Sequence, residues 1–189
     1  MDARTYDIEA FTEGLIENGL ILPTGIRGAY GRGPVFEDIL RAFNDLVTRI
    51  AAPDKAQELM FPPILARAMI EKVGYMDNFP QLAGSVHSFM GSDREARELS
   101  AKVHAGERWE DLLSPTDVML TPAACYPVYP TFTGLLPEGG KLVTVMNWVF
   151  RHEPSDEPTR LQHFRMREVI RVGKPDQGVQ WRTAWLERG

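Results

Sequence analysis

Apolar residues recur at helical spacing along much of the chain. The clearest stripe follows Pro34 and comprises Val35, Phe36, Ile39, Leu40, Phe43, Leu46, Val47 and Ile50. Proline suits the first turn of a helix, so this stripe predicts a helix from Pro34 that ends at Pro53. The stripe is broad, and burial on one or two sides is expected.

Three further segments favour helices. Residues 1–18 predict a short amphipathic helix ended by Gly19, and residues 64–73 predict another. Ser92 with Glu95 three residues later forms a capping box, which indicates a mostly exposed helix over 92–103. The C-terminal helix is expected from about Gln177, with Trp181 and Trp185 on one face.

Short apolar runs between prolines and glycines predict strands. The run 58–61 stops at Pro62 and Pro63, which cannot donate a ladder hydrogen bond, so this pairing ends there or lies at a sheet edge. Residues 117–122 predict a second strand, and the runs 141–150 and 169–172 predict a hairpin around a polar loop. The segments 23–34, rich in glycine, and 74–80 are expected to be loops, with Val86, Phe89 and Met90 in the core.

Composition indicates one domain with a hydrophobic core, since the chain has 189 residues and 43% hydrophobic content. No apolar run is long enough to span a bilayer, and the first residues do not form a secretory signal. The single cysteine, Cys125, excludes an internal disulfide framework and fits a reducing compartment. A cytoplasmic location is therefore expected.

The charge is acidic overall but unevenly distributed. A net charge of −5 and a pI of about 5.4 argue against a basic surface for duplex nucleic acid. One short stretch nevertheless holds five arginines, namely Arg151, Arg160, Arg165, Arg167 and Arg171. Arginine makes forked contacts with phosphate or carboxylate, so the stretch predicts either an anion site or a solvated hairpin with its own ion pairs.

Residue types in this stretch suit a nucleotide. Arg151 and Glu153 alternate, which would place both on one face of a strand. Arg160 would approach from the loop, while Phe164 offers a flat apolar ring for a purine and Glu168 a carboxylate for an amino group or a metal. Core packing of Phe164, and a salt bridge from Glu168 to a nearby arginine, are the alternative interpretations.

The order aromatic-Arg-x-Glu, loop, Arg-x-x-x-Phe-x-x-x-Glu resembles motif 2 of class II aminoacyl-tRNA synthetases. Together with FPP at 61–63, KVGYMDNFPQL at 72–82 and TPAACYPVYP at 121–130, it resembles the seryl-type amino acid:[carrier protein] ligases. These proteins keep the synthetase core without the long tRNA-binding arm. The resemblance implies an α+β fold with an antiparallel sheet flanked by helices, in which residues 1–189 are one domain, the N-terminal portion of the core with motifs 1 and 2.

The same resemblance implies a role for individual residues. Arg151 would hold the α-phosphate of ATP and Arg160 the γ-phosphate, making these two the catalytic pair. Glu153 would lie near the adenine or the activated group, and Phe164 would stack on adenine. Pro62 would lie at a dimer interface. Cys125 and Glu168 would bind zinc.

The implied function is ATP-dependent activation of a small amino acid, glycine or alanine, as an aminoacyl adenylate, with Mg²⁺. The amino acid would then pass to the phosphopantetheine thiol of an acyl or peptidyl carrier protein, and the enzyme would be a homodimer that does not use tRNA. The chain ends before the family's second zinc-binding cysteine and motif 3, so we expect either a fragment or a truncated paralogue. A seryl-type synthetase fragment and a non-catalytic binding module are the alternative functions.

Overall fold

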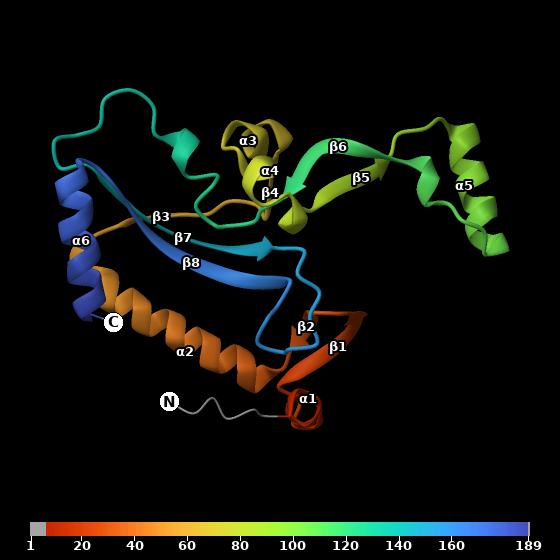
Figure 1. Cartoon of the computed structure of the whole chain (residues 1–189), viewed down its shortest axis with the longest axis horizontal. Coiled ribbons are helices and arrows are strands. Elements are labelled where there is room, and N and C mark those ends of the chain that lie inside the picture. The colour runs from red at the N-terminus through yellow and green to blue at the C-terminus, as the bar shows by residue number, and fades with distance from the viewer. Residues whose placement is uncertain (1–6, 189) are drawn as a thin grey trace.

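The computed structural model describes residues 7–188 and is built from small, mostly antiparallel sheets with helices around them (Figure 1). The helices are α1 (Ile8–Glu17), α2 (Pro34–Ala51), α3 (Arg67–Lys72), α4 (Tyr75–Asn78), α5 (Asp93–Ala105) and α6 (Pro175–Arg188). The strands are β1 (Ile21–Ile26), β2 (Ala29–Arg32), β3 (Gln57–Leu59), β4 (Ile64–Ala66), β5 (Ser85–Phe89), β6 (Leu113–Leu120), β7 (Lys141–Phe150) and β8 (His163–Val172). The α+β class with antiparallel sheets is confirmed.

The central sheet has the order β3-β7-β8. Strands β7 and β8 form the predicted hairpin, in continuous antiparallel register from Lys141 opposite Val172 to Phe150 opposite His163. Strand β3 joins β7 in parallel at the edge, as the two prolines after it predicted. Helix α2 lies along one face of the hairpin, and the segment 121–132 lies along the other (Figure 1).

Strand β8 begins six residues earlier than the apolar run 169–172 indicated, at His163. Each added residue pairs with a residue of β7, which is strongly apolar, and this pairing stabilises the strand conformation of the polar part of β8. The arginine-rich stretch after residue 162 is therefore strand, and its side chains alternate between the two faces of the sheet.

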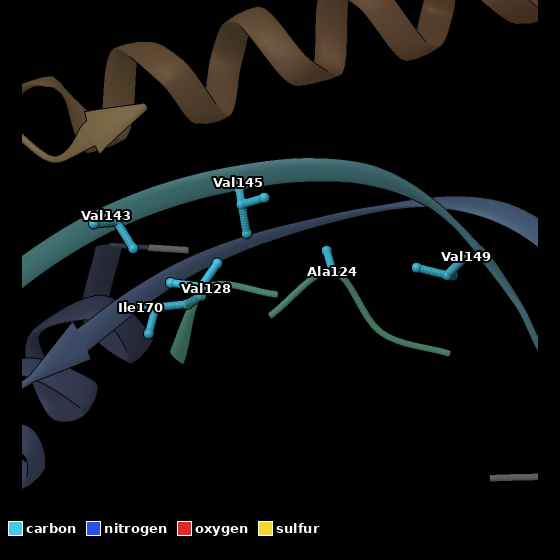
Figure 2. Close-up of a cluster of buried hydrophobic side chains, with 6 residues drawn as sticks. All are labelled: Ala124, Val128, Val143, Val145, Val149 and Ile170. Atoms are coloured by element: carbon cyan, nitrogen blue, oxygen red, sulfur yellow. The ribbon is translucent and has the colours of Figure 1, made fainter. Parts of the chain in front are cut away.

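The main core lies on the face opposite α2. Three valines of β7 meet two residues of the segment 121–132 and one of β8, as Figure 2 shows: Val143, Val145, Val149, Ala124, Val128 and Ile170. All of these side chains are at least nine-tenths buried. This packing fixes the proline-rich segment 121–130 against the sheet.

A second sheet, of order β4-β6-β5, carries its own small core against α3 and α4. Three predictions were partly wrong here. Residues 64–66 are strand β4 and not helix, because they pair with β6, and the expected loop 74–80 contains α4. Met90 is also no core residue, since 73% of its surface is exposed.

The glycine-rich segment is a hairpin, β1–β2, and not the predicted flexible loop. Gly25 and Gly28 both have positive φ, at 81° and 73°, which residues with a Cβ rarely adopt. The Thr24 hydroxyl donates to the carbonyl oxygen of Ala29 across the turn. The glycines thus shape a defined reversal.

Helix α2 begins at Pro34 as predicted and ends at Ala51. One side packs on the hairpin, with Phe36, Leu40, Val47 and Ile50 half-buried, so burial is confirmed on that side. The neighbouring apolar stripe is exposed and consists of Val35, Ile39, Phe43 and Leu46. Two other predicted helices are confirmed as α5, with its capping box, and α1, although residues 1–6 of the predicted N-terminal helix lie outside the described residues.

Within residues 7–188, no helix combines the length and the apolar character needed to cross a membrane.

Candidate active site

The connection between β7 and β8 is held at both ends by backbone hydrogen bonds. The amide of Arg151 donates to the carbonyl oxygen of Gln162 at 2.8 Å, and that of His152 donates to Leu82 at 3.0 Å. Strand β7 ends at Phe150, so Arg151 and Glu153 do not alternate along a strand as the sequence suggested. Backbone contacts to neighbouring segments fix their positions instead.

Arg151 lies between the segment 121–132 and β8. Its Nε donates to the carbonyl oxygen of Pro122 at 3.0 Å, and its guanidinium carbon lies 5.7 Å from the centroid of the Phe164 ring. No carboxylate of residues 7–188 forms an ion pair with it. A half-buried cation without an anionic partner is a favourable position for a phosphate.

A pocket of about 170 Å³ opens beside Arg151, lined also by Tyr75, Phe79, Leu82, Pro122, Ala123 and Tyr126. Burial raises the pKa of both tyrosines, and the positive charge of Arg151 opposes that shift. The walls are thus largely apolar, with two neutral hydroxyls and one cation. Such a pocket suits a small ligand with an acidic group.

Arg160 and Glu153 face each other across the loop, with Arg160 Nη2 2.9 Å from Glu153 Oε1. The hydrogen bond and the charge of Glu153 raise the pKa of Arg160. The Arg160 side chain is 64% exposed, so the pair is open to water and can exchange Glu153 for another anion. A pocket of about 280 Å³ lies here, lined by Glu153, Thr159, Arg160, Leu161 and Phe164.

The five arginines fall into two groups: Arg151 and Arg160 lie in the connection between the strands, and the other three lie on β8. Arg165 and Arg167 point to α2, where Arg165 binds both carboxylate oxygens of Glu37 and Arg167 binds Asn44. Arg171 donates to the carbonyl oxygen of Gly139. These three side chains therefore have structural partners, but they do not form the ion pairs within the hairpin that the alternative interpretation expected, since Glu37 and Asn44 belong to α2. Phe164 packs on the main core, as the alternative interpretation expected, and its ring also lines the second pocket.

Cys125 and Glu168 meet as expected. The backbone amide of Cys125 donates to Glu168 Oε1 at 3.0 Å. Burial, followed by the charge of Glu168 and a hydrogen bond to it, raises the pKa of the Cys125 thiol to about 11. Burial and the neighbouring thiol raise the pKa of Tyr129, which is hydrogen-bonded to Cys125, to about 12. Within residues 7–188, the salt bridge considered for Glu168 does not form.

A thiol and a carboxylate are suitable zinc ligands, so these two donors fit the metal chemically. They do not complete a site, because within residues 7–188 no group of three or more histidine, cysteine, aspartate and glutamate side chains is placed to hold a metal ion. Neither His152 nor His163 joins the pair. A third protein ligand would have to come from outside the described residues.

Two features were missed in the sequence. Tyr75 is only 6% exposed, and its hydroxyl has no hydrogen-bond partner within the described residues. Its ring meets Tyr126 edge-on at 5.8 Å, in the wall of the pocket beside Arg151. Gln162 is 5% exposed and connects the candidate site to the β1–β2 turn. The sequence could not predict these contacts, because Tyr126 and the β1–β2 turn lie far from Tyr75 and Gln162 along the chain.

The fold is that of the class II aminoacyl-tRNA synthetases. An M. kandleri SerRS in complex with A. aeolicus tRNASec superposes on 100% of this chain and 39% of its own, with a TM-score of 0.82 and 16% identity. A Giardia lamblia prolyl-tRNA synthetase in complex with prolyl-adenylate covers 96% of this chain and 34% of its own (TM-score 0.71, 12% identity). A Cryptosporidium parvum prolyl-tRNA synthetase complexed with halofuginone and AMPPNP covers 94% of this chain and 32% of its own (TM-score 0.67, 16% identity).

The more specific similarity is to two Bradyrhizobium diazoefficiens proteins. Amino acid--[acyl-carrier-protein] ligase 1 is 41% identical over 166 residues, which are 87% of this chain and 51% of the relative. Ligase 2 is 36% identical over 175 residues, 92% of this chain and 52% of the relative. The resemblance found in the sequence is confirmed, and the chain spans about half the length of these relatives. No protein-family model matches the chain.

Proposed function

We propose that this chain carries the ATP-binding half of an amino acid:[carrier protein] ligase, the N-terminal portion of a class II synthetase core. The observation that carries the proposal is Arg151, a cation without an ion pair within residues 7–188, which contacts Phe164 and lines a small pocket. The names of the two relatives support the reaction, and the nucleotide in the Cryptosporidium synthetase supports ATP as the ligand of this fold.

In the first step, a carboxylate oxygen of the amino acid attacks the α-phosphorus of ATP, and pyrophosphate leaves. Negative charge grows on the α-phosphate oxygens, and Arg151 stabilises it from a position that the Pro122 carbonyl already fixes. Arg160 would leave Glu153 and bind the γ-phosphate, while Glu153 contacts the nucleotide and Phe164 stacks on adenine. Mg²⁺, when bound with ATP, neutralises phosphate charge.

In the second step, the phosphopantetheine thiol of a carrier protein attacks the carbonyl carbon of the adenylate. AMP leaves, a thioester forms, and the thiol proton passes to solvent. The amino acid in this proposal is glycine or alanine, as the family resemblance implies, and the pocket beside Arg151, with a volume of about 170 Å³, has room for a substrate of this size.

Cys125 and Glu168 would supply two ligands to a zinc ion that binds the amino group of the substrate. When bound, zinc would fix the substrate through that group. Zinc analysis of a purified protein of the relatives' full length that includes this chain, in wild type and Cys125→Ser, tests this part, with one zinc per chain expected only in the wild type.

The proposed assembly is a cytoplasmic homodimer that uses a carrier protein and no tRNA. The exposed stripe of α2 supports a dimer, because four apolar side chains on one helix face, each at least 44% exposed, favour association. Pro62, the residue expected at the interface, is exposed too, and its carbonyl oxygen accepts a hydrogen bond from Asn147.

Pyrophosphate exchange tests the reaction. A protein of the relatives' full length that includes this chain should exchange labelled pyrophosphate into ATP with glycine or alanine, and should load the amino acid onto a phosphopantetheinylated carrier. Charging of tRNA with serine would instead identify a seryl-type synthetase. Absence of exchange with glycine, alanine and serine would contradict the proposal and favour a binding module.

A further inference from the structure

The β1–β2 turn contacts the connection between β7 and β8 through Gln162. The backbone amide of Gln162 donates to the carbonyl oxygen of Gly28 at 2.7 Å. Its side-chain Nε2 donates to the carbonyl oxygen of Arg27. Its own carbonyl oxygen accepts the amide of Arg151 at 2.8 Å. One buried residue therefore joins the turn to the arginine that is central to the proposed ATP site.

The turn fits closely against the connection. A Cβ placed on Gly28 would lie 3.2 Å from Gln162 Cγ and 3.3 Å from the Ser155 nitrogen. These contacts are tighter than ordinary van der Waals packing, and one of the two atoms belongs to backbone. Gly28 is therefore needed for its close approach to the loop as well as for its positive φ of 73°.

An ion pair adds to this contact at the surface. Arg27 binds both carboxylate oxygens of Asp156, with Nε 2.7 Å from Oδ1. Both side chains are more than half exposed, so the pair itself contributes little to stability. The buried hydrogen bonds of Gln162 carry the attachment.

We propose that Gly28 and Gln162 are positioning residues, which hold Arg151 and the loop 151–162 in the geometry that binds the triphosphate. The β1–β2 hairpin thus acts as a support for the nucleotide loop. The inference rests on the proposed ATP site for its functional part. Its structural part, the restraint of the loop, is independent of ATP.

The chain offers a matched control. Gly25 lies in the same hairpin with a positive φ of 81°, but a Cβ there would have no atom within 4 Å. Gly25→Ala and Gly28→Ala therefore impose similar backbone strain, and only Gly28→Ala disturbs the loop. The test is residue-resolved amide hydrogen exchange without ATP, followed by titration of ATP into each variant.

Gly28→Ala should accelerate exchange of the Arg151 and Gln162 amides about tenfold relative to Gly25→Ala, and should weaken ATP binding about tenfold. Exchange in the β4-β6-β5 sheet should stay unchanged, which separates loosening of the loop from global unfolding. If Gly28→Ala does not fold, Gln162→Ala takes its place in the test and should accelerate hydrogen exchange of the Arg151 amide.

Equal exchange in Gly25→Ala and Gly28→Ala would overturn the inference, as would weakened ATP binding without faster exchange at these amides. A wild-type chain that binds no ATP would contradict the proposed function only, because the exchange comparison would still decide whether the hairpin restrains the loop.

Discussion

The guanidinium of Arg151 lies over the ring of Phe164, with 5.7 Å between the guanidinium carbon and the ring centroid. The hydrogen bond from Arg151 Nε to Pro122 fixes the side chain from a second direction. The cation is therefore oriented before a ligand arrives, and little reorganisation is needed when phosphate binds. The same ring lines the pocket that holds Arg160, so Phe164 connects the two candidate phosphate contacts.

Phe164→Leu should weaken ATP binding while leaving the fold largely intact. Stacking of a base on an aromatic ring contributes about 1–3 kcal/mol, and leucine keeps apolar volume but offers no flat ring. We expect the dissociation constant for ATP to rise about tenfold by isothermal titration calorimetry. An unchanged dissociation constant would show that Phe164 serves the core alone.

Arg160→Ala should weaken ATP binding and spare AMP binding. The side chain is 64% exposed and its partner Glu153 lies on the same loop, so its loss should change the melting temperature by less than about 2 °C. AMP lacks the γ-phosphate and is the matched ligand control. Equal weakening for ATP and AMP would place Arg160 elsewhere on the nucleotide.

Phe43→Asp should convert the proposed homodimer to a monomer. Phe43 is 62% exposed in the isolated chain, in the middle of the apolar stripe on α2, and a buried unpaired carboxylate would oppose association. Val179→Asp on α6, at a position 65% exposed, is the control. Sedimentation equilibrium checks both variants, and a Phe43→Asp protein that stays dimeric would exclude this face.

The pKa of His163 should lie below the usual range for histidine. Its ring stacks on Trp148 at 4.7 Å between centroids, and burial followed by the charge of Arg32 lowers its pKa. The folded state therefore binds its proton less readily than the unfolded chain does. The resulting stability contribution is present above the ordinary histidine pKa of about 6.5 and is lost as the pH falls below it.

The pKa of His163 is measured by NMR titration of its ring protons. Arg32→Met should raise the value because it removes the neighbouring charge, whereas Arg41→Met, at an exposed position, should leave it unchanged. A wild-type value at or above about 6.5 would contradict the assignment.

Local patterns predicted the parts of the fold that depend on near neighbours in sequence. Helix α2 follows from Pro34 and its periodic stripe, and α5 from the Ser92–Glu95 capping box. The first half of β8 could not be predicted, because its polar residues become strand only through pairing with β7. The β1–β2 hairpin was missed for a similar reason, since its glycines were equally compatible with a loop.

In the candidate site, too, the residues marked by a local sequence pattern were predicted, and the contacts between distant segments were not. Arg151, Arg160 and Phe164 stood out through a spaced motif, and Cys125 was conspicuous as the single cysteine. The structure brings Cys125 to Glu168 through a backbone hydrogen bond of 3.0 Å. The contacts of Tyr75 and Gln162 depend on residues far along the chain, so the sequence did not show what these two side chains pack against.

The central claim is that the connection between β7 and β8 binds ATP through Arg151. The most direct measurement is calorimetric titration of ATP and Mg²⁺ into the wild-type chain, Arg151→Ala and Arg108→Ala, whose exposed arginine pairs with Asp111. The account predicts saturable binding to wild type and Arg108→Ala, and binding at least about tenfold weaker in Arg151→Ala with an unchanged circular dichroism spectrum. Absence of binding to the wild type, or equal binding to all three, would contradict it.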